Sequence, residues 1–364
     1  MRKIVVEEDR VLRLIQVILD PSATPERVAA FADFNSTDPP DFGAWLTDLR
    51  ALLPALYPAQ VQLVGSQEEL NKHLTACDVA IVESLRVGAE ELALAPNLTL
   101  VQNFGTVADN VDAPACERKG IATRTLRRRT NIAMGEHTMM LVLALAKRLA
   151  LINGLVTKDR LAAAGYAFRP YDSQHTAKAN FGRIPDLRTL HGTTLGLLGF
   201  GEIGREVATL ARAFGMRVMY HKRNRLDATQ EAALGVSYYS FDELFASSDY
   251  LSVHVPLSEE TRNLVGEAAL SRMRRGAYLV NTSRAEIVNH EALLGALNSG
   301  RLAGAGLDVL YQEPAPEHEP LLAFDNVILT PHLGGASRRN GLDDAREMLL
   351  AIEAHLQRSG RPAQ

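Results

Sequence analysis

Several residue types and patterns are scarce in this chain of 364 residues. It has only two cysteines, Cys77 and Cys116, and neither has the neighbours of a metal-ligand motif. Two thiols in a chain of this length argue against a disulfide framework and are typical of a reducing compartment. The net charge of -4 does not provide the basic surface that binds nucleic acid. We therefore expect no metal site and no nucleic-acid partner.

Long hydrophobic runs are also absent. The longest strongly apolar stretch, Met139–Ala146, is too short to span a bilayer. The first ten residues carry acids where a signal peptide has an apolar core. These features predict a cytoplasmic protein without a membrane partner. The length, with 46% hydrophobic and 23% charged residues, predicts two globular domains.

The most informative segment that is present is residues 195–204, an apolar run that stops at a glycine. Three glycines then follow with the spacing G-x-G-x-x-G, and helical periodicity continues from 205 to 214. The first glycine permits a tight turn, the second lets a phosphate approach, and the third lets helix and strand pack closely. The N–H groups at the helix start would hold a pyrophosphate. Strand, turn and helix in this order predict a dinucleotide site rather than a glycine-rich surface turn. The predicted contacts are Gly199, Gly201, Glu202, Ile203 and Gly204.

The turn after the next strand, predicted at 217–220, bears on the choice of cofactor. An acid about 20 residues past the glycines would bind the ribose 2′-hydroxyl of NAD. Here the chain reads His-Lys-Arg-Asn-Arg after Tyr220, with no acid before Asp227. Cations pair with a 2′-phosphate, which a carboxylate would repel. NADP(H) is therefore favoured and NAD(H) stays open, with a basic surface loop of relaxed preference as the alternative. The predicted contacts are Arg223 first, then Lys222, Arg225 and Tyr220.

The first part of the chain has a pattern of its own. Strands predicted at 11–19, 61–64, 79–82, 98–101 and 119–123 alternate with helices at 25–34, 42–53, 67–76 and 90–95. This alternation predicts a separate α/β domain with a parallel sheet. Ligands of such sheets bind beyond the carboxyl ends of strands. Asn103, Phe104 and Gly105 are thus candidate substrate contacts, with an ordinary strand-to-helix turn as an equal alternative.

Three further segments are less clear in function: an arginine cluster, an apolar helix and a long stretch without periodicity. Arg127-Arg128-Arg129 is interpreted as a solvated basic face, with attraction of an anionic substrate as the alternative. The helix predicted at 135–153 is apolar nearly all round, so it is expected to be buried and to be a candidate dimer contact. On it, His137 is expected to be a packed structural histidine rather than a ligand. Residues 154–190 show no firm periodicity, and loops this long are uncommon unless functional or mobile.

Motifs spread over the second half of the chain resemble the D-2-hydroxyacid dehydrogenase family. The resemblance runs from about Leu100 to the C-terminal helix, and it depends on the order and spacing of the motifs rather than on any one of them. The motifs are Gly199–Gly204, His254–Thr261, Val280–Arg284, Gly306–Val309, Glu313-Pro314 and Pro331–Ala336, with weaker marks at Asp109–Asp112 and Gly135–His137.

The resemblance implies an α/β fold with two Rossmann-like domains. A flavodoxin-like substrate domain would comprise residues 1–128 plus 335–364, including a C-terminal helix at 338–357. A doubly wound dinucleotide-binding domain would comprise residues 129–334, with the active site in a cleft between the two. Members are usually dimers through the cofactor domain, so a homodimer is expected.

The resemblance also assigns a catalytic trio, Arg284, Glu313 and His332. The planar fork of an arginine suits the carboxylate and carbonyl of a 2-keto acid. A histidine, whose ordinary pKa is about 6.5, can supply the proton that the carbonyl oxygen needs. A neighbouring glutamate orients the imidazole and favours its protonated form. The remaining cofactor contacts implied are Val255, Pro256, Thr261, Thr282, Gly334 and Asp308, the acid expected near the nicotinamide.

The chain departs from the family pattern at several positions. Val107 replaces a second glycine, and the arginine cluster replaces an Asn-x-Pro-like turn. Glu83 stands where phosphoglycerate-using relatives have an arginine, which disfavours a phosphorylated substrate. Pro331 stands where the formate enzyme has glutamine, which argues against formate.

The sequence thus favours hydride transfer between NADP(H) and a small 2-keto or 2-hydroxy acid of the D-isomer, for example glyoxylate or hydroxypyruvate. The alternative belongs to another class of protein: a non-catalytic, corepressor-like dimer that binds NAD(P) and partner proteins.

Overall fold

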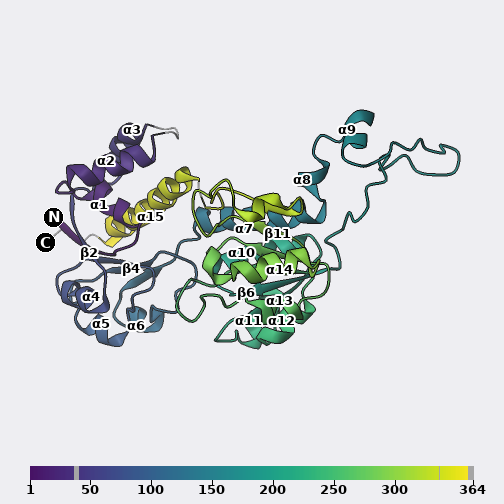
Figure 1. The fold of residues 1–364 in the computed structure, drawn as a ribbon. Helices are drawn as coiled ribbons and strands as arrows, with labels where there is room; N and C mark the ends of the chain where they lie inside the picture. Colours follow the sequence, from purple (N-terminus) through teal and green to yellow (C-terminus); the bar gives the residue numbers. More distant parts are fainter. Residues whose placement is uncertain (37–40, 336, 360–364) are drawn as a thin grey trace. The chain divides into compact units, whose positions relative to one another are not determined.

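The computed structural model describes residues 1–36, 41–335 and 337–359, and it divides into two compact units (Figure 1). The first unit contains Met1–Asn131 and the chain after Ala336, and the second contains Ile132–Gly335. Ala336, the last residue of the Pro331–Ala336 motif, lies outside the described residues. In the described part of the chain no helix is both long enough and apolar enough to cross a membrane.

The first unit is built on a five-stranded parallel sheet in the order β2-β1-β3-β4-β5. This is the flavodoxin-like order, as the sequence predicts. The strands are β1 (Arg2–Glu7), β2 (Ala59–Val64), β3 (Val79–Val82), β4 (Leu100–Asn103) and β5 (Ala122–Arg124). The helices are α1 (Arg13–Leu19), α2 (Pro25–Phe34), α3 (Phe42–Ala51), α4 (Gln67–Leu74), α5 (Ala89–Ala93), α6 (Ala113–Arg118) and the C-terminal α15 (Arg338–Ser359).

The first strand is the clearest error of the sequence interpretation. Residues 11–19, predicted as a strand, form helix α1, and the strand is Arg2–Glu7. A short apolar run fits a buried helix as well as a buried strand. In the turn that precedes the helix, the carboxylate of Asp9 accepts the N–H groups of Val11 and Leu12, at 2.7 and 3.3 Å. Its apolar side chains then pack into the core beside the sheet.

The C-terminal helix α15 belongs to the first unit. Its buried face, which includes Met348, Leu349 and Ile352, joins the same core as α1 and α3. The buried carboxylate of Glu353 accepts the backbone N–H groups of Ala55 and Leu56 at 3.0 Å. Helix α15 is thereby fixed to a segment almost three hundred residues earlier in the sequence.

The second unit contains a seven-stranded parallel sheet in the order β12-β11-β10-β9-β6-β7-β8. Counted from β6, this is the doubly wound dinucleotide-binding order with one further strand. The strands are β6 (Thr194–Leu198), β7 (Arg217–His221), β8 (Ser237–Tyr238), β9 (Tyr250–Val253), β10 (Ala277–Asn281), β11 (Leu302–Leu307) and β12 (Val327–Leu329). The helices are α7 (Arg129–Ala146), α8 (Leu149–Ile152), α9 (Lys158–Ala163), α10 (Glu202–Ala213), α11 (Ala228–Leu234), α12 (Phe241–Ser247), α13 (Glu267–Arg272) and α14 (His290–Asn298), with short 3₁₀ turns η1 (Ala285–Ile287) and η2 (Pro320–Ala323).

The single helix predicted at 135–153 is divided into α7 and α8. Arg148 adopts a left-handed backbone with φ of 52°, which ends the first helix and redirects the chain. Leu141 and Val142 are buried against the sheet, as expected, but Met140 on another face of α7 is 43% exposed. After α8 and α9 the chain follows a long irregular path on the outside of the unit, up to β6 (Figure 1).

Candidate functional site

One edge of the second sheet gathers most of the residues that the sequence singles out. Strands β9, β6, β10, β11 and β12 are neighbours and run parallel, so their carboxyl ends lie along one edge. The glycine turn follows β6, Arg284 follows β10, Asp308 follows β11 and His332 follows β12. Ligands of doubly wound sheets bind at this edge.

The glycine turn has the geometry of a dinucleotide cradle. Gly199 has φ of 95°, and a Cβ on it would lie 2.6 Å from the backbone carbonyl of His254. Helix α10 begins at Glu202, directly after Gly201, so its first N–H groups point out of the turn. A Cβ on Gly204 would lie 3.2 Å from the carbonyl oxygen of Gly199. These residues fit a bound pyrophosphate, because the backbone approaches closely where side chains would block it.

The turn after β7 contains cations in different environments. Arg225 makes a two-pronged pair with Glu231, with distances of 2.8 and 3.0 Å, and its guanidinium lies over the ring of Tyr238. Arg223 is 91% exposed and lies 3.9 Å from Glu260. Tyr220 is completely buried, and its hydroxyl donates to Glu231. Tyr220 and Arg225 therefore brace the turn, while Arg223 extends from it.

Four predicted cofactor contacts lie on the segments that follow β9 and β10. Val255 packs partly on the apolar core, and Pro256 is exposed. Thr261 donates its hydroxyl to the carbonyl oxygen of Pro256 at 2.7 Å, which closes the loop between them. The buried hydroxyl of Thr282 lies 3.1 Å from that of Thr138 on α7.

The structure pairs two members of the predicted trio directly. Nδ1 of His332 lies 2.8 Å from Oε2 of Glu313, and Oε1 of Glu313 accepts the N–H of Leu310 at 3.0 Å. Burial raises the pKa of Glu313, but the hydrogen bonds from His332 and Leu310 outweigh it, so the net pKa is lowered. The carboxylate therefore stays charged beside the imidazole. Both side chains remain accessible, since 48% of His332 and 41% of Glu313 is exposed.

The third member, Arg284, is exposed and lies three positions after the end of β10. Its Nη1 donates to the carbonyl oxygen of Ser283 at 2.7 Å, and its own carbonyl oxygen accepts from the amide of Asn281 at 2.9 Å. The backbone of Arg284 is thus fixed to the end of β10. By its position after β10, Arg284 belongs to the same sheet edge as His332, which follows β12.

Asp308 is a buried carboxylate with four donors around it. Oδ1 accepts from the hydroxyl of Thr330 at 2.5 Å and from the N–H of Leu333 at 2.8 Å, and Oδ2 accepts from the N–H of Gly334 at 2.8 Å. Nε2 of His137 lies 3.1 Å from Oδ1. Burial raises the pKa of Asp308, but these hydrogen bonds more than offset that effect and lower the pKa to about 2.

The contacts of His137 and Thr330 with Asp308 were missed by the sequence interpretation. His137 was expected only as a packed histidine, and Thr330 was not singled out. The sequence signals near them were the weak family mark at Gly135–His137 and the motif at Pro331–Ala336, which begins directly after Thr330. Gly334, a predicted cofactor contact, is buried beside the same carboxylate.

The predicted substrate residues lie at the carboxyl end of β4 in the first unit, and all three are buried. The amide of Asn103 donates to the carbonyl oxygens of Gly105 and Val107, both at 3.2 Å, which shapes this turn. The guanidinium of Arg128 lies 4.8 Å from the ring centre of Phe104.

The neighbouring arginine cluster is not simply a solvated face. Arg128 pairs with Glu83 at 2.7 Å, and Arg129 pairs with Asp344 and Glu347 at 3.1 and 2.7 Å. Two of the three arginines are therefore held in ion pairs within the first unit, and the interpretation of the cluster as a solvated face is wrong for them.

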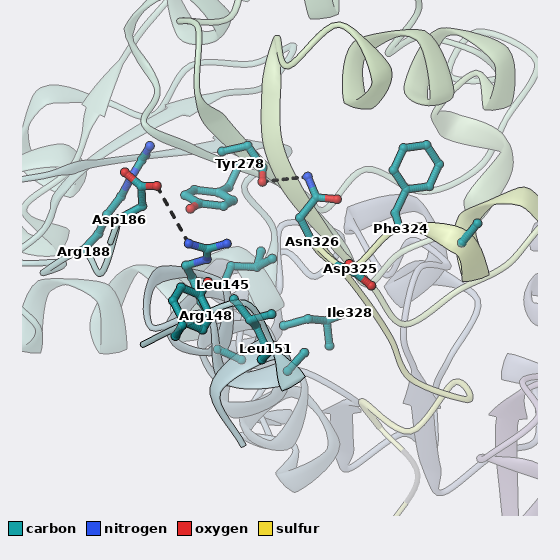
Figure 2. Close-up of a pocket in the computed structure, with 16 residues that line it drawn as sticks. Leu145, Arg148, Leu151, Asp186, Arg188, Tyr278, Phe324, Asp325, Asn326 and Ile328 are labelled. Atoms are coloured by element: carbon teal, nitrogen blue, oxygen red, sulfur yellow. Dashed lines mark hydrogen bonds and ion pairs between the residues drawn. The ribbon is translucent and has the colours of Figure 1, made fainter. Parts of the chain in front are cut away.

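A cavity of about 800 Å³ lies elsewhere on the second unit (Figure 2). Its lining includes Tyr278, Asn326 and Arg188, near the starts of β10 and β12 and before β6. In Figure 2 Arg148 extends toward Asp186, 3.8 Å away. The cavity is at the amino edge of the sheet, opposite the glycine turn, so it is not part of the site described above. Within residues 1–36, 41–335 and 337–359, no group of three or more His, Cys, Asp or Glu side chains is arranged to hold a metal ion.

Known proteins are similar to this chain in sequence and in fold. Residues 139–334 match the family model described as D-isomer specific 2-hydroxyacid dehydrogenase, NAD binding domain. A glyoxylate reductase of Aeropyrum pernix is 38% identical over 271 residues, which cover 74% of this chain and 75% of that protein. A glyoxylate reductase of Korarchaeum cryptofilum is 36% identical over 276 residues, covering 75% and 77%.

Solved structures extend the similarity over nearly the whole chain. A glyoxylate reductase from Paecilomyes thermophila has a TM-score of 0.52 at 25% identity and covers 98% of this chain and 96% of its own. The apo D-mandelate dehydrogenase of Rhodotorula graminis has a TM-score of 0.55 at 22% identity, covering 96% and 92%, and supports the fold alone. With its Rossmann unit, its glycine turn and these relatives, the chain belongs to the D-isomer specific 2-hydroxyacid dehydrogenases, enzymes that use a nicotinamide dinucleotide.

Proposed function

We propose that this protein is an NADPH-dependent reductase that converts a small 2-keto acid such as glyoxylate to the corresponding D-2-hydroxy acid. The observation that carries the proposal is the 2.8 Å contact between His332 and Glu313 at the sheet edge that also bears the glycine turn. The glyoxylate reductases among its relatives support the substrate class.

Each member of the trio has a distinct role in this proposal. Arg284 binds the substrate carboxylate and carbonyl oxygen through its planar guanidinium. His332 donates a proton to the carbonyl oxygen, and Glu313 holds the ring and stabilises its charged form. The nicotinamide supplies the hydride. Thr282, Asp308 and Gly334 line the nicotinamide end, and Val255, Pro256 and Thr261 line the apolar rim.

In this proposal, residues of the first unit bear on the charge of the substrate. Asn103, Phe104 and Gly105 contact the substrate from the end of β4. Glu83 and Arg128 neutralise each other beside Phe104, so no net positive charge is provided there for a second anionic group. A phosphorylated 2-keto acid is therefore disfavoured relative to one that carries a single carboxylate.

The turn after β7 supports NADPH over NADH. Arg223 provides the contact to the 2′-phosphate with help from Lys222, because Arg223 is largely exposed. Arg225 supports the turn through its pair with Glu231. A guanidinium forms strong charge-assisted hydrogen bonds with phosphate, and here no carboxylate stands directly after β7 to repel it.

We also propose that two copies of the chain form a dimer through the second unit. Met140, Leu149 and Phe214 are 43%, 51% and 43% exposed, and they line one apolar groove of about 430 Å³ between α7, α8 and α10. A continuous apolar surface of this kind is costly to leave in water. The same groove on a second copy is a chemically matched partner for it, as expected for a two-fold interface.

The activity is tested by following NADPH oxidation with glyoxylate, hydroxypyruvate, pyruvate and a phosphorylated 2-keto acid. We expect turnover with the small unphosphorylated acids. Arg284→Ala should lower kcat/KM by about a thousandfold, the loss of a charged contact made in the transition state. Its NADPH affinity should change little. NADPH binding without turnover on any acid would contradict the proposal and favour the corepressor-like alternative.

A further inference from the structure

The loop that carries His332 adopts an unusual backbone conformation. His332 itself has φ of 56°, in the left-handed region that a residue with a side chain rarely adopts. Its N–H donates to the carbonyl oxygen of Thr330 at 2.9 Å. A Cβ on Gly334 would lie 2.7 Å from the sulfur of Met134 and 2.9 Å from Oδ2 of Asp308. Such a strained turn persists only where its surroundings hold it.

Asp308 is the group that holds this loop. The two residues directly after His332 both donate their backbone N–H groups to its carboxylate, at 2.8 Å. Asp308 directly follows β11 and is 1% exposed, so it is a fixed anchor. Its position therefore determines where the imidazole of His332 stands.

His137 reaches the same carboxylate from a different element of the unit. It projects from α7, and its side chain is 13% exposed. Its Nε2 lies 3.1 Å from Oδ1 of Asp308 and 3.1 Å from the hydroxyl of Thr330, which itself donates to Oδ1. A buried carboxylate requires such donors, and removing one leaves it undersatisfied.

We propose that His137 is a positioning residue for the proton donor His332, and that it acts through Asp308 and Thr330. This inference rests on the proposed function, because it presumes that His332 donates a proton during turnover. Without the N–H of His137, the carboxylate and the loop N–H groups bound to it can shift together. A displacement of about 1 Å at a reacting group can cost up to a hundredfold in rate.

The test compares two substitutions of His137 that both introduce a side-chain amide but differ in side-chain length. In His137→Gln the side-chain amide nitrogen falls near the place of Nε2, whereas in His137→Asn it stops one methylene short. We expect kcat for glyoxylate reduction to fall about tenfold in His137→Asn, or about 1.4 kcal/mol. His137→Gln should keep kcat within about threefold. KM for glyoxylate should stay within about twofold in both variants, because Arg284, the proposed carboxylate-binding residue, is not bonded to Asp308. The dissociation constant of NADPH, measured by fluorescence, should change less than kcat, because the proposed pyrophosphate and 2′-phosphate contacts lie on other turns.

His175→Asn is the matched control. His175 also pairs with a carboxylate, Asp172, at 2.8 Å, but on the exposed segment between α9 and β6. It should behave as the wild-type protein. Equal kcat in the Asn and Gln variants of His137, with an active wild-type protein, would overturn the positioning role. An inactive wild-type protein would instead overturn the proposed function itself.

Discussion

At the scale of single residues, the exposed His332–Glu313 pair and the buried carboxylate of Asp308 contribute differently to folding stability. The His332–Glu313 pair is nearly half exposed, and exposed pairs contribute little to folding stability. In the proposed mechanism its value is chemical, because Glu313 provides a negative charge beside the imidazole of His332. Asp308 is buried and accepts several hydrogen bonds, so its ionisation is coupled to folding.

This coupling predicts a pH-dependent stability. The folded-state pKa of Asp308, about 2, lies below the ordinary aspartate value. The stabilisation is therefore complete above pH 4–5 and is lost as the pH falls toward 2. Asp308→Asn places an amide among donors and should lower the free energy of unfolding by about 2 kcal/mol at pH 7, and by roughly half of that at pH 3. Urea unfolding at the two pH values measures both.

Asp172→Asn is the control for this experiment, because Asp172 is 57% exposed and lies on the irregular segment before β6. It should leave the free energy of unfolding nearly unchanged at pH 7. A destabilisation by Asp308→Asn that is the same at pH 7 and pH 3 would show that the carboxylate charge is not the stabilising feature.

At the scale of elements, the sequence predicts those whose signals are local. Helix α2 begins at a proline after Thr24, whose side chain caps it, and β3 and β10 are apolar runs between turn residues. Helix α2 and strand β3 have the predicted bounds. The sequence interpretation predicted a strand at helix α1 because its apolar residues do not show a clear helical periodicity. The true first strand, Arg2–Glu7, is recognisable mainly by its pairing with β2 and β3 on either side.

The candidate site also contains parts with a local sequence signal and parts that only the folded structure brings together. The glycine turn is a contiguous motif, so its geometry follows from a few neighbouring residues. The Asp308 cluster instead joins residues from α7, the end of β11 and the segment after β12. His137 and Asp308 are 171 positions apart in the chain, and no local pattern links them. Only the sheet order, which brings these segments together, makes the cluster visible.

The turn after β7 leads to a prediction at this scale. Arg223→Ala should raise the dissociation constant of NADPH by about tenfold or more, since a charge-assisted contact with phosphate contributes about 1.5–3 kcal/mol. NADH, which lacks that phosphate, should bind nearly as before. Fluorescence titration with both cofactors measures the difference. Arg169→Ala, on the irregular segment between α9 and β6, serves as the control and should bind both cofactors as the wild-type protein does. Tighter binding of NADH than of NADPH by the wild-type protein would contradict the proposed NADPH preference.

At the scale of the whole molecule, the chain leaves the first unit after α7 begins and returns to it with α15. The first core is therefore complete only when the last helix has packed on α1 and α3. The second unit is a continuous segment, and its trio lies on it alone. Its folding and its cofactor cradle thus depend on one uninterrupted stretch, while the first unit depends on both ends of the chain.

The apolar groove between α7, α8 and α10 gives the last prediction. If a second copy covers it, the protein should sediment as a dimer, at twice the chain mass of 39.7 kDa. Met140→Asp should shift it to the monomer mass, because a charge buried at the centre of an apolar interface costs several kcal/mol. Analytical ultracentrifugation at several concentrations measures the mass. Leu94→Asp, at an equally exposed leucine in the first unit, should leave the dimer intact. A wild-type protein that sediments as a monomer at all concentrations, or a Met140→Asp protein that stays dimeric, would refute this interface.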